Sequence, residues 1–291
     1  MKRRLIAAVL VAMALAPAGA EAALPALRIG VGARISPRET AGSYEAMLNW
    51  VGRKLGRKVE LVQYTTYAEM DAALERLDLD FAFIGAGPYV RDHAKFGAEL
   101  LVAPQIRGVP FYYSYLLVPA GAPARRLADL RGKRFAFTDP TSASGRLVPT
   151  YMIGKEFGVG PEAFFGSVAF TWSDDRSIDE VNAGRVDGAS VDSLLYDYLA
   201  KRNPARVKNV RVLTRSMPYG IPPFVSTRAA DPRVKMQLRE LLLSMHEDAE
   251  GKQILGTMEI ERFIVPADAN YDAIRDMEAW LANPSALRAR R

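Results

Sequence analysis

The chain has 291 residues, no cysteine and only two histidines, and its 39 basic and 33 acidic side chains give a formal net charge of +6. The lack of cysteine excludes a disulfide framework, a thiol nucleophile and a thiolate metal site. With so little histidine, a His-based triad or a zinc site has little material, so we expect no hydrolase and no bound metal or cofactor. Basic residues are scattered among acidic ones and form no stripe, which predicts no nucleic-acid partner.

The first 22 residues have the pattern of a secretory signal peptide. A basic start, Lys2-Arg3-Arg4, precedes an apolar segment that is too short to span a bilayer comfortably, and two small-x-small cleavage patterns end at Ala20 and Ala22. We expect residues 1–22 to be removed and the mature chain to be exported and soluble; an uncleaved signal anchor is the alternative. No cysteine follows the apolar segment, so we expect no lipoprotein anchor.

From residue 27 onward strand-like and helix-like patterns alternate, which predicts an α/β fold with mostly parallel sheets. The first block comprises a strand at 27–31, a helix at 39–55, a strand at 59–64, a helix at 67–77 and a buried strand at 81–84. Gly85-Ala86-Gly87-Pro88 then predicts a turn. A strand-like segment at 111–118 breaks at the Pro- and Gly-containing residues 119–123, the first candidate hinge.

A second block repeats this order of patterns. It comprises a strand at 135–137, a helix that ends near 157–158, a strand at 168–172, a helix at 177–183, a strand that ends at 192 and a strand at 210–213. Residues 218–223 predict the return crossing, a strand at 224–226 re-enters the first lobe, and helices at 231–246 and 271–281 complete it. We therefore expect two lobes, residues 23–118 with 224–291 and residues 119–223, with a small ligand in the cleft between them.

The segment Thr138–Pro149 contains the most informative local pattern. Hydroxyls and small residues follow the strand at 135–137 and precede a helix. The first N–H groups of such a helix, together with the positive end of its dipole, form an anion-binding site, to which Ser142 and Ser144 can add hydroxyl donors. The alternative is that Ser142 or Ser144 only caps the helix.

Four blocks of the sequence carry a family resemblance. Asp139-Pro140-Thr141-Ser142-Ala143-Ser144-Gly145 with Leu147-Val148-Pro149 resembles the DPxSxSG…VP segment of the phosphate/phosphite/phosphonate-binding components of ABC importers. Three further blocks resemble the same family in the same order, Thr65–Tyr67 with Leu79–Gly85, Pro110–Val118, and Arg185–Ala189. The resemblance covers nearly the whole mature chain and implies a two-lobed periplasmic-binding-protein fold of type II with two crossovers, located in the periplasm.

The resemblance also implies roles for individual residues. It places the hydroxyls of Ser142 and Ser144 on the oxyanion, together with the backbone of Ala143 and Gly145, where Ala143 stands at a position that is Thr in many members. It implies that Tyr67 and Tyr112 donate to the anion. The alternatives are a partly exposed aromatic at a helix start for Tyr67 and packing at the lobe junction for Tyr112. Tyr113 and Tyr115 lie on the opposite strand face from Tyr112, and we expect them in the core.

The chain departs from relatives that bind aminoalkylphosphonates. Asp174 lies where those proteins have a histidine that reaches the anion, and a carboxylate there would repel a dianion. In those relatives two carboxylates bind the amine of the ligand, and the corresponding positions of this chain fall near Leu194 and Pro222. We therefore expect the amine-binding pocket to be absent or rebuilt. Asp174 and Asp192 could serve a cationic part of the ligand; a solvated or capping role is the alternative, with Asp192 as the cap of a helix that runs through Leu199.

The function implied by the resemblance is that of a monomeric periplasmic solute-binding protein. It would bind a small oxyanion, a phosphonate, phosphite or phosphate, and deliver it to the permease of an ABC importer without covalent chemistry. The alternative is a periplasmic sensing module that presents its ligand state to a membrane sensor kinase. An enzyme on this scaffold would need histidine or cysteine chemistry at the cleft.

Overall fold

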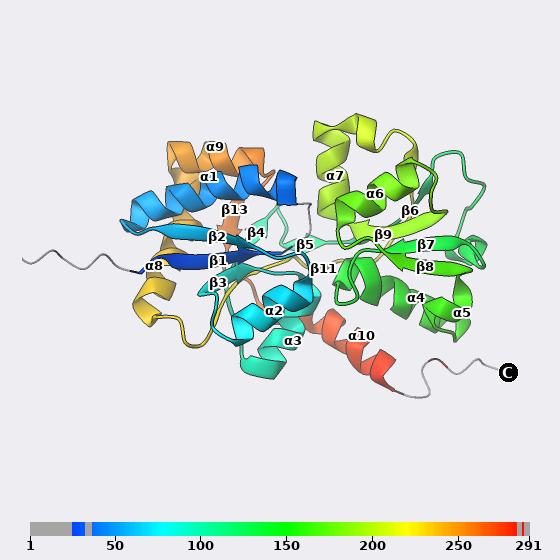
Figure 1. Ribbon diagram of the computed structural model, residues 1–291, viewed down its shortest axis with the longest axis horizontal. Helices are drawn as coiled ribbons and strands as arrows, with labels where there is room; N and C mark the ends of the chain where they lie inside the picture. Colours follow the sequence, from blue (N-terminus) through cyan, green and yellow to red (C-terminus); the bar gives the residue numbers. More distant parts are fainter. Residues whose placement is uncertain (1–24, 33–36, 284–286, 288–291) are drawn as a thin grey trace, which may run out of the picture.

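The computed structural model describes residues 25–32, 37–283 and 287, and it contains two lobes that are each built around one sheet (Figure 1). The predicted signal peptide, residues 1–22, lies outside the described residues. In the part of the chain that the structure describes, no helix combines the length and the hydrophobicity that crossing a bilayer requires.

The first lobe contains a six-stranded sheet with the order β13-β4-β12-β3-β1-β2. Its strands are β1 (Leu27–Val31), β2 (Val59–Gln63), β3 (Phe81–Phe83), β4 (Glu99–Gln105), β12 (Phe224–Ser226) and β13 (Arg262–Ile264). Its helices are α1 (Pro37–Leu55), α2 (Tyr67–Glu75), α3 (Ala86–Phe96), α8 (Pro232–Ser244) and α9 (Ala249–Thr257). Helices α1 and α9 cover one face of the sheet, and α2 and α3 cover the other (Figure 1).

The second lobe contains a five-stranded sheet with the order β10-β6-β9-β7-β8. Its strands are β6 (Ser114–Pro119), β7 (Arg134–Phe137), β8 (Ser167–Phe170), β9 (Gly188–Asp192) and β10 (Val210–Arg215). Its helices are α4 (Val148–Phe157), α5 (Pro161–Phe164), α6 (Asp174–Asn182) and α7 (Ser193–Arg202). Apolar residues of α4 and α5 pack on one face of this sheet, and those of α6 and α7 pack on the other.

The pairing within both sheets is mixed, which corrects the expectation of mostly parallel sheets. In the first lobe β1 pairs in parallel with β2 and β3, but β12 lies antiparallel between β3 and β4. In the second lobe β7 pairs in parallel with β8 and β9, but β6 lies antiparallel between β9 and β10. These two strands, β6 and β12, each follow a crossing between the lobes. Each runs antiparallel to its neighbours in the sheet that it joins.

The crossings between the lobes are two short strands, β5 (Phe111–Tyr112) and β11 (Tyr219–Gly220), which pair antiparallel to each other. The return crossing therefore lies within the predicted residues 218–223. The first crossing lies earlier than predicted, because β6 is hydrogen-bonded to β9 and β10 of the second sheet. The predicted lobe boundary after residue 118 is thus wrong for this strand, and residues 119–123 form a turn within the second lobe.

The C-terminal helix α10 (Asp272–Ala282) touches both lobes, although its sequence was assigned to the first. In the first lobe Arg91 of α3 pairs with Glu278 at 2.8 Å. In the second lobe Trp280 packs edge-on against Tyr151 of α4, with ring centroids 5.2 Å apart. The helix therefore bridges α3 and α4 at the lobe junction.

Helix α3 was not predicted, because its N-cap and first turn, residues 85–88, have the sequence pattern of a turn. Gly85 is its N-cap, and Pro88 lies in its first turn, where a missing N–H costs nothing because that group has no partner within the helix. Gly87 is needed here for another reason. A Cβ at Gly87 would lie 2.9 Å from the carbonyl oxygen of Thr141 and 3.2 Å from the nitrogen of Ala143, both in the second lobe. Helix α3 thus reaches the segment for which an anion site was predicted.

Candidate functional site

The predicted anion loop follows β7 and leads into a continuous helical segment, residues 143–157. Its first turn, Ala143–Leu147, is a wide π turn that continues into α4. Ser142 is the N-cap, and its Oγ accepts a hydrogen bond from the nitrogen of Gly145 at 3.0 Å. The predicted capping role is therefore confirmed for Ser142. A capping hydroxyl uses a lone pair, so its hydrogen is still available to donate to a ligand.

The loop is buried and tightly constrained. Ser142, Ala143, Ser144 and Gly145 are all buried. A Cβ at Gly145 would lie 1.7 Å from the Oγ1 of Thr138, so only glycine fits at this position. The carbonyl oxygen of Ser144 accepts hydrogen bonds at 2.7 Å from two further hydroxyls, those of Ser114 and Ser190. The backbone of the loop is thus held in place by the sheet behind it.

Asp139 connects this loop to the first lobe. Its Oδ1 accepts hydrogen bonds from the nitrogen and the hydroxyl of Thr141, both at 2.7 Å, and its Oδ2 accepts one from the nitrogen of Tyr67 at 3.3 Å. Tyr67 is the first residue of α2, and Thr66 caps that helix in a capping box with Glu69. Sequence reasoning placed Asp139 in the motif but assigned it no role. The only signal was its position before Pro-Thr, which favours a turn closed by the aspartate side chain.

Tyr67 lies between two glycines at the lobe interface. A Cβ at Gly32 would lie 3.2 Å from the Cε1 of Tyr67, and a Cβ at Gly85 would lie 3.3 Å from its Cε2. Tyr67 is 5% exposed, so the alternative of a partly exposed helix-start aromatic is wrong. The two glycines leave room for the ring in the interior of the interface.

Tyr112 lies in β5 and belongs to an apolar cluster that spans both lobes. Its neighbours in that cluster include Ala143 of the second lobe and Tyr271, which precedes α10, so Tyr112 packs at the lobe junction as the alternative prediction stated. Tyr113 and Tyr115 do face the other way. Tyr115 packs against the apolar cluster beneath α6 and α7, whereas the expectation that Tyr113 belongs to the core is wrong. Both are half-buried and line a cavity between the lobes.

The two aspartates of uncertain role are buried, each 2% exposed, so the expectation that they are solvated is wrong. The Oδ1 of Asp174 accepts a hydrogen bond from the nitrogen of Asp192 at 2.9 Å. The Oδ1 of Asp192 accepts one from the nitrogen of Leu194 at 2.7 Å and caps α7, as the capping alternative predicted. These bonds hold the start of α6 close to the end of β9.

The donors near the loop include neutral groups. The buried hydroxyls of Thr138 and Ser173 have no hydrogen-bond partner among the described residues. Two cations lie beside the loop. Arg91 donates to the carbonyl oxygen of Thr141 at 2.6 Å. Arg146 lies over the ring of Phe137 and donates through Nη2 to Glu162 at 2.6 Å, while its buried Nη1 has no hydrogen-bond partner among the described residues. Within the described ranges, no three His, Cys, Asp or Glu side chains are grouped to hold a metal ion. The arrangement can therefore bind an anion through hydroxyls and the N–H groups of a helix start.

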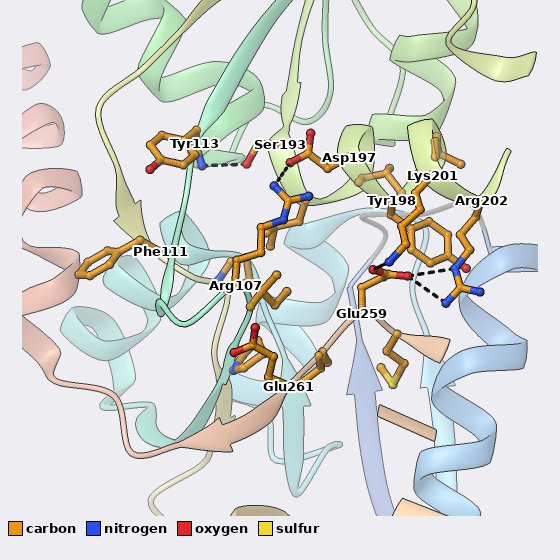
Figure 2. Close-up of a pocket in the computed structure, with 18 of the residues that line it drawn as sticks. Arg107, Phe111, Tyr113, Ser193, Asp197, Tyr198, Lys201, Arg202, Glu259 and Glu261 are labelled. Atoms are coloured by element: carbon orange, nitrogen blue, oxygen red, sulfur yellow. Dashed lines mark hydrogen bonds and ion pairs between the residues drawn. The ribbon is translucent and has the colours of Figure 1, made fainter. Parts of the chain in front are cut away.

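A cavity of about 920 Å³ lies between the lobes (Figure 2). Ion pairs join the lobes across its rim. Arg107 of the first lobe pairs with Asp197 of α7 at 2.9 Å. Glu259, which follows α9, pairs with Lys201 at 2.5 Å and with Arg202 at 2.9 Å, both of α7. Sequence reasoning missed these pairs, because nothing in the sequence indicates that residues 107 and 259 face the same helix.

Comparisons with known proteins agree with this architecture. A family model described as the periplasmic substrate-binding protein of ABC phosphonate transporters matches residues 29–271. The chain is 28% identical over 252 residues to the phosphate-import protein PhnD of Mycolicibacterium smegmatis, covering 80% of this chain and 78% of that protein. It is 25% identical over 276 residues to the phosphonates-binding periplasmic protein of Escherichia coli K12, covering 90% and 79%.

Two solved structures have the same fold. The binding-protein component of an ABC phosphonate transporter from Pseudomonas aeruginosa aligns with a TM-score of 0.82 at 22% identity, covering 87% of this chain and 85% of that one. PhnD1 from Prochlorococcus marinus, solved in complex with methylphosphonate, aligns with a TM-score of 0.80 at 21% identity, covering 88% and 98%. The predicted two-lobed α/β fold of type II periplasmic binding proteins is confirmed.

Proposed function

The chain belongs to the family of periplasmic substrate-binding proteins of ABC phosphonate transporters, and from this membership we propose where and how it binds its ligand. It is a solute-binding protein of an ABC importer, and its ligand is a small oxyanion of the phosphonate, phosphite or phosphate class. Its partner is the membrane complex of that importer. The proposal extends to a monomeric mature protein whose signal peptide, residues 1–22, is removed and which has no lipid anchor.

The proposed anion site is the loop formed by Ser142, Ala143, Ser144 and Gly145. The observation that carries it is a buried helix start, at residues 143–157, which lies at the lobe interface beside unpartnered hydroxyls. The first N–H groups of a helix have no partner within the helix and attract negative charge. In a site closed off from water, such neutral donors bind an oxyanion strongly.

The proposal assigns the other predicted residues to two roles. Tyr67 and Tyr112 would donate their hydroxyls to the anion from the first-lobe side and from the crossing strand. Asp174 and Asp192 would hold the backbone that surrounds the anion, which is supported by the bonds that each accepts from a main-chain nitrogen. No covalent step is proposed, because the residues of the proposed site act as hydrogen-bond donors to the anion and none of them is an activated nucleophile.

Calorimetric titration with methylphosphonate, phosphite and phosphate tests the site. Ser144→Ala should weaken the binding of the preferred anion about tenfold or more, since a hydrogen bond to a charged group contributes roughly 1.5–3 kcal/mol. Ser167→Ala is the matched control, because Ser167 is exposed on β8 of the same lobe. Unchanged affinity in a folded Ser144→Ala variant would contradict the assignment.

A further inference from the structure

We propose that the ligand carries an uncharged organic substituent on its phosphorus and that the cavity between the lobes holds this substituent. The inference rests on the proposed function, since it concerns the same ligand at the same site. It narrows the ligand class from small oxyanions in general to organophosphonates with an apolar group.

The lining of the cavity includes residues next to two residues of the proposed site, Tyr67 and Asp192. Gly32 lines the cavity, and a Cβ at Gly32 would lie 3.2 Å from the Cε1 of Tyr67. Ser193 and Leu194 also line it, directly after Asp192 in the chain. An anion held at the loop would therefore have its substituent directed along the start of α7 and into the cavity.

The size of the cavity does not suit a bare inorganic ion. Ligand pockets commonly measure roughly 300–1,000 Å³, and this one measures about 920 Å³ although ion pairs already join the lobes across its rim. A phosphite or phosphate ion would fill only a small part of such a space. The remainder would stay filled with water against an apolar wall, which is unfavourable.

The lining of the cavity is mainly apolar and aromatic. The first lobe contributes Phe83 and Met258, and the second contributes Leu194 and Tyr198. Pro222, from the segment that follows the return crossing, is buried against the same space. These side chains offer an apolar surface to a substituent.

The carboxylates of the lining are engaged with other groups. Asp197 is paired with Arg107 at 2.9 Å, and Glu259 is paired with two cations of α7. Glu261 accepts a hydrogen bond from the nitrogen of Gly108 at 2.9 Å. Neither Asp174 nor Asp192 is among the lining residues. An ammonium group on the substituent would therefore lose water without gaining a free carboxylate, which is costly for a buried charge.

A matched pair of ligands tests the chemistry of the cavity. n-Propylphosphonate and 2-aminoethylphosphonate have the same chain of heavy atoms and differ in a terminal methyl against an ammonium group. In calorimetric titrations of the wild-type protein, we expect n-propylphosphonate to bind at least tenfold more tightly than 2-aminoethylphosphonate. Phenylphosphonate should bind at least tenfold more tightly than methylphosphonate. Equal or tighter binding of the amino compound would overturn the proposal.

A variant of the lining separates the cavity from the anion site. Leu194→Ala removes apolar surface from the cavity. It keeps the backbone nitrogen of residue 194, which donates a hydrogen bond to Asp192. It should weaken the binding of n-propyl- and phenylphosphonate by at least five times more than it weakens that of methylphosphonate, which places less apolar surface in the cavity. If methylphosphonate binds but larger substituents bring no gain, this inference alone fails. If neither methylphosphonate nor phosphite nor phosphate binds the wild type, the proposed function fails with it.

Discussion

Two carboxyl groups near the anion loop interact with each other, Asp71 of α2, which is half-buried, and Asp92 of α3, which is buried. Burial raises the pKa of Asp71 to about 7 and that of Asp92 to about 8. Repulsion by Asp139 raises the pKa of Asp71 further, and repulsion by Asp71 raises that of Asp92. The positive charge of Arg91 acts against both increases in pKa. At neutral pH the pair therefore retains a proton that an unfolded chain has lost.

This proton makes the stability of the protein depend on pH. The pKa values of both carboxyl groups are higher in the folded protein than in the unfolded chain. Their contribution to the free energy of unfolding is therefore fully present below about pH 4 and is lost as the pH rises through 7 to 8. Asp92→Asn removes one charge, and the variant should be more stable than wild type at pH 9 by on the order of 1–3 kcal/mol. Denaturant unfolding at pH 5 and pH 9 measures the difference. Asp276→Asn, at an exposed carboxyl of α10, is the control, and parallel pH profiles for wild type and Asp92→Asn would refute the account.

At the residue scale, capping could be predicted and contacts between lobes could not. Ser142 and Asp192 precede helices, and a polar side chain before a helix predicts a cap. The bond from Tyr67 to Asp139 joins residues 72 positions apart, and no local pattern indicates it. The alternation of Tyr112 and Tyr113 correctly predicted opposite faces. The alternation does not indicate which of the two faces is buried, because that depends on how α3 and α10 pack against β5.

The first turn of α3 is an element of the first lobe that lies against the anion loop. Gly87 leaves no space for a side chain, because a Cβ there would meet the backbone of Thr141 and Ala143. Gly87→Ala should therefore hold the lobes apart and weaken methylphosphonate binding about tenfold. The helix itself should tolerate the change, since alanine is the better helix former by roughly 0.5–1 kcal/mol.

Gly42→Ala is a matched control for this prediction. Gly42 lies within α1, and a Cβ there would meet nothing within 4 Å. Calorimetry and thermal unfolding of both variants separate the two effects, because only Gly87→Ala should change the affinity. Wild-type affinity in Gly87→Ala would mean that α3 does not approach the loop when ligand is bound.

At the element scale, the sequence predicted most strands and helices but placed their connections less well. Alternating patterns and the glycines after α1 and α4, Gly56 and Gly158, marked element ends, and both glycines have positive φ. Helix α3 was missed because Gly-Ala-Gly-Pro is also a turn pattern. Strand β6 was assigned to the wrong lobe because the Pro- and Gly-containing break at residues 119–123 was interpreted as the hinge. Such a break is equally typical of a turn between two strands of the same lobe.

At the scale of the whole molecule, ion pairs across the cavity rim connect the two lobes. Glu259→Gln removes the partner of Lys201 and Arg202. Exposed pairs contribute about 0–1 kcal/mol each, so we expect ligand affinity to fall roughly two- to fivefold at low salt, with the difference shrinking at high salt because charges are screened.

Glu180→Gln is the control for this ion-pair prediction. Glu180 pairs with Arg185 at 2.7 Å within the second lobe, so its loss does not affect contact between the lobes. Titrations at two salt concentrations measure both variants. An equal effect of the two substitutions, or an effect of Glu259→Gln that does not depend on salt, would show that the pairs do not stabilise the closed arrangement.

A crystal structure of the mature protein with methylphosphonate tests the central claim most directly. We predict that the phosphonate lies between the lobes at the start of the helical segment 143–157. Its oxygens should lie within about 3 Å of the hydroxyls of Ser142 and Ser144 and of the first backbone nitrogens. Its methyl group should point toward the cavity lined by Leu194 and Pro222. A phosphonate bound elsewhere, or one bound between these lobes without contact to residues 142–145, would contradict the account.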